Sequence, residues 1–129
     1  MALSRLAQEM AAEIRQHDWS DAPYRADRAG HNRETDTNRP PYQLDPGQTA
    51  IVRLNVMWVT AQVLGHADPN FDVYEYAEAC GVNTLTRYGR KDGGIVAGLR
   101  IDWSDGEKPH YCYPGTWDTG TGRYIPNKS

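Results

Sequence analysis

A long helix with a well-marked start and apolar residues on nearly every face constrains the fold of this chain more than any other feature. Asp45 is a good N-cap, Pro46 suits the first helical position, and Gln48 completes the capping pattern three residues after the cap. The residues that follow, to about Gly65, are apolar on all sides, which is typical of a helix buried by several neighbours. We therefore expect this helix, over about residues 47–65, to be the centre of a single core, with Gly65 ending it.

Two further helices are predicted, one on each side of it in the sequence. Apolar side chains recur at three- and four-residue steps over residues 4–17, at Leu3, Leu6, Met10 and Ile14. The stripe is narrow, so we interpret residues 1–17 as an accessory helix or an oligomer contact rather than a core element. Asp68 and Pro69 predict the start of another helix and Gly81 predicts its end. Its expected inner face consists of Val73, Tyr76, Ala77 and Cys80.

The hydrophobic period changes after Gly81. Apolar and polar residues alternate over residues 95–103, which predicts a strand with one buried face. Residues 104–107 read as a hairpin turn, residues 109–113 as the returning strand and residues 123–125 as a short edge strand. The predicted fold class is α+β, with a helical N-terminal part packed on a C-terminal antiparallel β-meander or hairpin.

The length of 129 residues fits one domain. Residues 18–46 show no periodicity and form a long polar loop or arm, which is either a poorly ordered linker or a binding arm. Residues 47–117 are expected to form the core, and residues 118–129 a tail rich in Gly and Thr.

Charge and composition narrow the classes of partner. The net charge of −3 gives no general attraction to nucleic acid or to an anionic membrane, and only residues 82–129 carry an excess of basic side chains. The sequence shows no signal peptide and no apolar stretch long enough to span a bilayer. We therefore expect a cytoplasmic protein with no membrane partner, in which Cys80 and Cys112 are free thiols.

One segment carries a motif of helix-turn-helix type, with a small residue and a glycine four positions apart. The residues that carry it are Ala77, Gly81, Val82 and the run Thr86-Arg87-Tyr88. Residues 73–113 thereby resemble MerR-type winged helix-turn-helix domains, which implies a recognition helix at residues 83–90 and a wing formed by the hairpin. The resemblance implies these DNA-facing residues: Arg87, Arg90, Lys91 and Arg100. The open alternative is that residues 83–90 are a strand or loop that opens a three-stranded meander.

Candidate catalytic and metal-binding groups are few. His31 lies in sequence among acidic residues, namely Asp27, Glu34 and Asp36, so acid–base chemistry is one reading of this set. His110 and Cys112 would lie on the same side of a strand, and Cys80 and His66 are the further thiol and imidazole. No spacing typical of a metal site supports ligation, and we expect neither a metal nor a cofactor.

The C-terminal third holds more aromatic rings than a small core needs. We interpret them as a partner-binding platform on the expected sheet, formed by Tyr88, Trp103, Tyr111, Tyr113 and Trp117. The predicted function is a small non-enzymatic binding or regulatory protein that contacts another protein or a second copy of itself. The alternatives are a winged-helix DNA-binding regulator and a small enzyme that uses His31 or His110.

Overall fold

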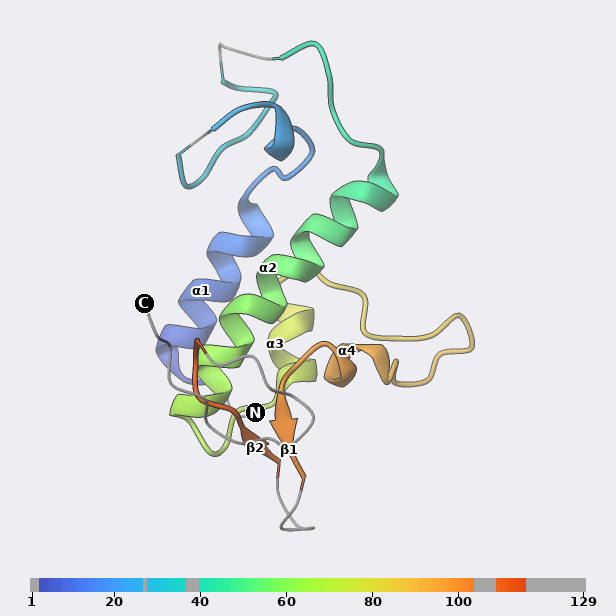
Figure 1. Ribbon diagram of the computed structural model, residues 1–129. Coiled ribbons are helices and arrows are strands. Elements are labelled where there is room, and N and C mark those ends of the chain that lie inside the picture. The colour runs from blue at the N-terminus through green and yellow to red at the C-terminus, as the bar shows by residue number, and fades with distance from the viewer. Residues whose placement is uncertain (1–2, 27, 37–39, 104–108, 116–129) are drawn as a thin grey trace.

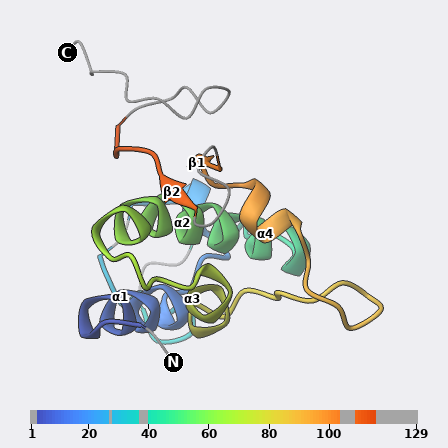
Figure 2. The same ribbon diagram turned by 90° about the horizontal axis from the view of Figure 1, so that it is seen from below.

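The fold is seen in a computed structural model that describes residues 3–26, 28–36, 40–103 and 109–115. The elements are α1 (Arg5–Gln16), a 3₁₀ turn (Ala22–Tyr24), α2 (Pro46–Ala67), α3 (Val73–Ala79), α4 (Gly94–Ala97), β1 (Ile101–Asp102) and β2 (His110–Tyr111). The long helix α2 lies in the middle, with α1 and α3 on one side and the β1–β2 hairpin on the other (Figures 1 and 2). The α+β class is confirmed, whereas the predicted meander is only a two-stranded hairpin among the described residues.

The start of α2 is as predicted, and its end is not. The Asp45 carboxylate accepts the Gln48 N–H, and the Gln48 side chain accepts the Asp45 N–H, so both halves of the capping box form. Gly65 was expected to end the helix, but α2 continues to Ala67. Gly65 is buried, and a Cβ there would lie 2.3 Å from the Tyr111 ring. The glycine therefore serves the close approach of the hairpin rather than a helix end.

The apolar character of α2 does not mean burial on all sides. Met57, Ala61 and Leu64 are buried against α1 and α3, as expected for the centre of the core. Ile51, Val59 and Val63 are instead exposed, with 57%, 69% and 49% of their surface accessible. The chain is too small to supply a neighbour for every face of a helix of 22 residues.

The first helix belongs to the core, so the prediction of an accessory element was wrong. The buried positions of α1 are Ala7, Ala11 and Ile14, whereas Leu6, which we assigned to the apolar stripe, is 60% exposed. Alanine side chains let α1 lie close to α3, because the distance between packed helices depends on the side chains at their contact.

The third helix has the predicted inner face and a later start. Val73, Tyr76, Ala77 and Cys80 are all buried, and Gly81 ends the helix in the left-handed conformation with φ of 87°. Asp72 rather than Asp68 is the N-cap, and its carboxylate accepts the N–H groups of the first turn. Asp68 instead caps the end of α2, where its N–H donates to the Leu64 carbonyl.

The strand predicted over residues 95–103 is mostly absent. Residues 94–97 form the short helix α4, because the Asp92 side chain and carbonyl accept the N–H groups of Gly94 and Ile95 and turn the chain. The regular pairing is limited to Ile101 opposite Tyr111 and Asp102 opposite His110. The predicted turn at 104–107, the edge strand at 123–125 and the tail lie outside the described residues.

A buried glutamine fastens the hairpin to α2. The Gln62 amide donates to the carbonyls of Arg100 and Cys112 and accepts the Arg100 N–H, at 2.9–3.1 Å. Gln62 is 4% exposed, so these bonds satisfy an amide that would be costly to bury alone. No helix in the described part of the chain combines the length and the apolar character that crossing a membrane requires.

Candidate functional site

Polar residues of the segment that follows α1 form a buried network around His31. Asp21 and His31 are each 1% exposed. The His31 Nε2 atom lies 2.9 and 3.2 Å from the two Asp21 carboxylate oxygens, and its Nδ1 atom contacts the Asp36 carboxylate. The Arg33 guanidinium donates to the same Asp21 carboxylate at 3.3 Å. One imidazole therefore joins two carboxylates that are 15 residues apart in the chain.

Backbone contacts fold this segment back on itself. The Asp18 N–H donates to the His31 carbonyl at 2.9 Å. The Asp18 carboxylate accepts the N–H and hydroxyl of Ser20 and, at 3.0 Å, the N–H of Arg33. Residues 18–36, expected as part of a loop or arm without regular structure, thus have an ordered polar centre where they are described. The segment lies at the end of α1 and α2 that is far from the hairpin (Figure 1).

With both carboxylates ionised, the network requires a charged imidazole. Carboxylates only accept hydrogen bonds, so a histidine that faces one at each ring nitrogen must donate from both nitrogens. Neither nitrogen of His31 is then available as a general base or a nucleophile. This geometry makes His31 a structural cation and does not support the alternative of an enzyme that uses it.

The two outer carboxylates have lowered pKa values. The hydrogen bond from His31 holds the pKa of Asp36 below its usual 3.8. Burial raises the pKa of Asp18, but hydrogen bonds from Ser20 and from the Arg33 backbone outweigh it and leave that pKa also below 3.8. Both groups therefore favour the ionised form at neutral pH.

Acid is expected to loosen the segment. Because the unfolded chain has the ordinary carboxylate pKa, it binds protons at a higher pH than the folded chain does. The stability that these pairs add is present above the unfolded pKa and is lost as the pH falls below about 5 and through the folded pKa. Urea unfolding between pH 7 and pH 3 checks this. The Asp36→Asn variant should show a flatter pH dependence, and an unchanged slope would contradict the role of Asp36.

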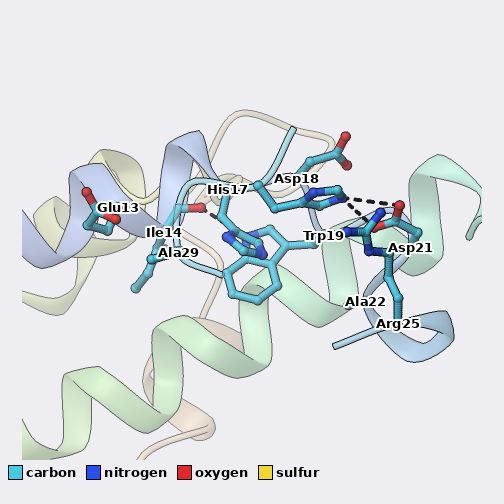
Figure 3. Close-up of a pocket in the computed structure, with 10 residues that line it drawn as sticks. Glu13, Ile14, His17, Asp18, Trp19, Asp21, Ala22, Arg25 and Ala29 are labelled. Atoms are coloured by element: carbon cyan, nitrogen blue, oxygen red, sulfur yellow. Dashed lines mark hydrogen bonds and ion pairs between the residues drawn. The ribbon is translucent and has the colours of Figure 1, made fainter. Parts of the chain in front are cut away.

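A pocket of about 390 Å³ lies between the end of α1 and this network (Figure 3). The His17 and Trp19 rings lie against each other along one wall, tilted by 43° with centroids 4.3 Å apart, and the Trp19 indole N–H donates to the Ile14 carbonyl. The remaining lining residues are Glu13, Asp18, Asp21, Ala22, Arg25, Ala29 and His31. The pocket can hold a small molecule against the two rings, but the charged side chains Asp18, Asp21 and His31 in its wall already bind partners within the network.

The sequence indicated part of this network. Of the three acids that lie near His31 in the sequence, Asp36 contacts its ring, Glu34 is exposed, and Asp27 lies outside the described residues. Asp21 and Arg33, which complete the site, were missed. Where it is described, the segment has no regular structure beyond the 3₁₀ turn that begins after Asp21, and so short a turn leaves no periodicity in the sequence that would have selected Asp21 over other nearby acids.

The residues considered for metal ligation do not converge. Cys80 and Cys112 are free and buried, whereas His66 and His110 are exposed. Burial raises the pKa of the Cys80 thiol to about 11, which makes it an unreactive core group. Among the described residues no three His, Cys, Asp or Glu side chains come together as a metal site.

The segment assigned to a recognition helix contains no helix. Residues 82–93 form a loop that projects from the body beside α3 and α4 (Figures 1 and 2). Arg87, Arg90 and Lys91 are exposed on it. Arg100 lies elsewhere, next to the hairpin, where its backbone binds Gln62. The four basic residues therefore do not form the single DNA-facing surface that the resemblance implies.

The aromatic residues predicted as a platform occupy different places. Tyr88 is on the projecting loop and is 76% exposed, and Trp103 is 57% exposed after β1. Tyr111 packs between Gly65 and Phe71, and burial raises its pKa to about 12. Tyr113 lies against the His66 ring, and Trp117 is outside the described residues.

A second pocket, which we call the α2–α4 groove, lies between α2 and the two ends of the projecting loop. Its volume is about 360 Å³. The residues that line it are Ala50, Ile51, Arg53, Leu54, Trp58, Gly81, Val82, Asn83, Asp92, Gly94 and Ile95. Trp58 is fixed there, because its indole N–H donates to the Ile95 carbonyl at 2.8 Å and its ring fills the space beside Gly98. The groove is therefore preformed.

No family model, curated protein or solved structure matches this chain. The resemblance to MerR-type domains is thus supported by no relative, and function has to be inferred from the geometry of the chain itself.

Proposed function

We propose that this chain is a non-enzymatic binding protein and that the α2–α4 groove is where it holds a segment of another protein. The observation that carries the proposal is an apolar groove with an unsatisfied arginine in its wall. The Nε atom of Arg53 is buried and has no hydrogen-bond partner among the described residues. Such a donor costs about 1–3 kcal/mol when it stays unpaired.

The shape of the groove fits side chains rather than a whole domain. Ile51, Leu54 and Trp58 form its apolar α2 wall, and Ile95 faces them. About 360 Å³ is at the lower end of the range of ligand sites and accommodates one or two anchoring side chains. Ile51 is 57% exposed, so a partner would bury apolar surface that the isolated chain leaves in water.

The charge of the groove specifies the partner further. Arg53 provides a guanidinium, which prefers a carboxylate as its partner. We therefore expect a peptide segment with an aliphatic or aromatic anchor next to Asp or Glu. Binding to a second copy of the chain remains a further prediction, because Val59 and Val63 of α2 are exposed apolar residues that the second copy could bury.

A random peptide library displayed on phage and selected on the immobilised full chain tests the proposal. Enriched peptides should combine an apolar anchor with an acidic residue. Ile51→Asp should lower the affinity for the best synthetic peptide by about 30-fold, which corresponds to the loss of about 2 kcal/mol typical of a hot spot. Arg53→Gln should lower the affinity for the acidic peptide more than the affinity for the same peptide with Asn or Gln in place of the acidic residue.

Val59→Asp is the matched control for Ile51→Asp. Val59 is exposed on the same helix but does not line the groove, so its variant should bind the peptide like the wild type. The proposal is wrong if no peptide is enriched, or if Ile51→Asp and Val59→Asp have equal effects. Thermal unfolding of each variant shows that the helix is intact.

A further inference from the structure

The projecting loop carries a second surface that the groove does not use. Residues 84–91 contain Arg87, Arg90 and Lys91 and no acidic residue, although the whole chain has a net charge of −3. The carboxylates nearest in sequence are engaged at the base of the loop. Glu78 accepts the Thr84 hydroxyl, and Asp92 accepts the Gly94 N–H, both at 2.9 Å. The tip is thus a local excess of positive charge.

The loop is well ordered by its own hydrogen bonds. The Thr86 N–H donates to the Arg90 carbonyl at 2.7 Å, and the Gly89 N–H donates to the Thr86 carbonyl at 2.9 Å. Gly89 has a φ of 79°, which lets the chain reverse at the tip. Leu85 and Lys91 pair as a β-bridge. A loop held in this way loses little entropy when a partner binds.

The base of the loop is attached to α3. The Lys91 ammonium lies 4.7 Å from the centre of the Tyr74 ring, and the Tyr74 hydroxyl donates to the Asp92 carbonyl at 3.0 Å. The tip therefore projects from a fixed base.

An exposed aromatic ring stands among the cations. Tyr88 has 76% of its surface accessible, a larger fraction than any other large hydrophobic side chain in the described part of the chain. The Arg87 guanidinium lies 5.0 Å from the centre of its ring. A planar ring beside exposed cations can stack on a base while the cations contact phosphates.

We propose that the loop over residues 84–91 binds single-stranded nucleic acid, with Tyr88 stacked on a base and Arg87, Arg90 and Lys91 on the backbone phosphates. A single strand is favoured over a duplex for two reasons. Residues 82–93 form no helix that could enter a major groove. A ring at the tip of a loop reaches a base face only where the base is not already stacked within a duplex.

Fluorescence anisotropy with a fluorescein-labelled oligothymidylate of about 20 nucleotides, longer than a typical single-strand site, tests the proposal on the full chain. Tyr88→Ala should weaken binding by roughly 5- to 150-fold, the range for loss of one stacked base. The wild type should show a slope of log affinity against log salt of about −2, from roughly −0.7 for each of three phosphate contacts. Arg90→Ala should make that slope shallower by about 0.7.

Two control variants match the ring and the charge. Tyr42 is an exposed tyrosine outside the loop, and Arg5 is an exposed arginine on α1, so Tyr42→Ala and Arg5→Ala should bind like the wild type. Ile51→Asp, which tests the α2–α4 groove, should also leave oligothymidylate binding intact. The two proposals can therefore fail independently.

Several results would overturn the proposal. One is no binding at low salt, and another is an affinity that Tyr88→Ala leaves unchanged. A blunt duplex that binds as tightly as the single strand would also contradict it. If polyglutamate at equal charge concentration displaced the oligothymidylate, the loop would recognise negative charge alone. An acidic protein could supply such charge as well as a nucleic acid does.

Discussion

Replacing His31 by alanine is expected to lower the free energy of unfolding by about 3–5 kcal/mol, the usual effect of removing one partner from a buried charge pair. The variant would leave the Asp21 carboxylate, which is 1% exposed, paired with the Arg33 guanidinium at 3.3 Å but without the imidazole. It would also release Asp36. Urea unfolding followed by tryptophan fluorescence measures the loss. Trp19 reports on this segment because it belongs to it and lines the same pocket as His31.

Two variants separate the charge from the space that His31 fills. Asp21→Asn combined with His31→Ala leaves no unpaired buried carboxylate, so it should be more stable than His31→Ala alone. Glu34→Ala changes an exposed acid of the same segment and should stay within about 0.5 kcal/mol of the wild type. If the double variant is less stable than the single one, packing rather than charge is the main contribution of His31.

Hydrogen exchange would show whether the loss is local. The Asp18 N–H donates to the His31 carbonyl, and the Arg33 N–H donates to the Asp18 carboxylate. If the segment opens by itself in His31→Ala, these amides should exchange faster while those in the middle of α2 remain protected. Equal acceleration throughout would instead mean that the network supports the whole fold.

The helices could be predicted because their signals are local. The capping box at Asp45 and the glycine after α3 act within a few residues of the chain, and both work as expected. The alternation over residues 95–103 misled for a physical reason. Ile95 and Leu99, which are buried, are four residues apart, and that spacing suits a helical turn as well as one face of a strand. The tertiary bond from Trp58 to the Ile95 carbonyl favours the helical turn.

The candidate sites were harder to predict because they depend on contacts between distant segments. The α2–α4 groove needs Trp58 to contact Ile95, 37 positions later, and no pattern in the sequence predicts that contact. The basic loop was visible as a cluster of residues, but its conformation was left open between helix, strand and loop. Exposure of Ile51 could not be foreseen, since an apolar residue on an apolar helix predicts burial.

Replacing Tyr76 by alanine is the second change expected to have a large effect, a loss of about 3–5 kcal/mol in the free energy of unfolding. Tyr76 is fully buried, and its ring lies 5.3 Å from that of Phe71. The Thr60 hydroxyl donates to the carbonyls of its own helix, so the Tyr76 hydroxyl is the donor in the 2.7 Å bond between them. The side chain thereby joins α3 to α2 through both packing and a hydrogen bond.

Tyr76→Phe separates these two contributions. It keeps the ring and removes only the donated bond, and the Thr60 hydroxyl retains its carbonyl partners, so the loss should be about 1 kcal/mol. Tyr42→Ala, at an exposed tyrosine, should have almost no effect on stability. If Tyr76→Ala lowered the free energy of unfolding no more than Tyr76→Phe does, the contact between α2 and α3 would not be the centre of the core. Both α2 and residues 81–83, which follow shortly after α3, line the α2–α4 groove. We therefore expect Tyr76→Ala to weaken peptide binding in the groove as well, although Tyr76 does not line it.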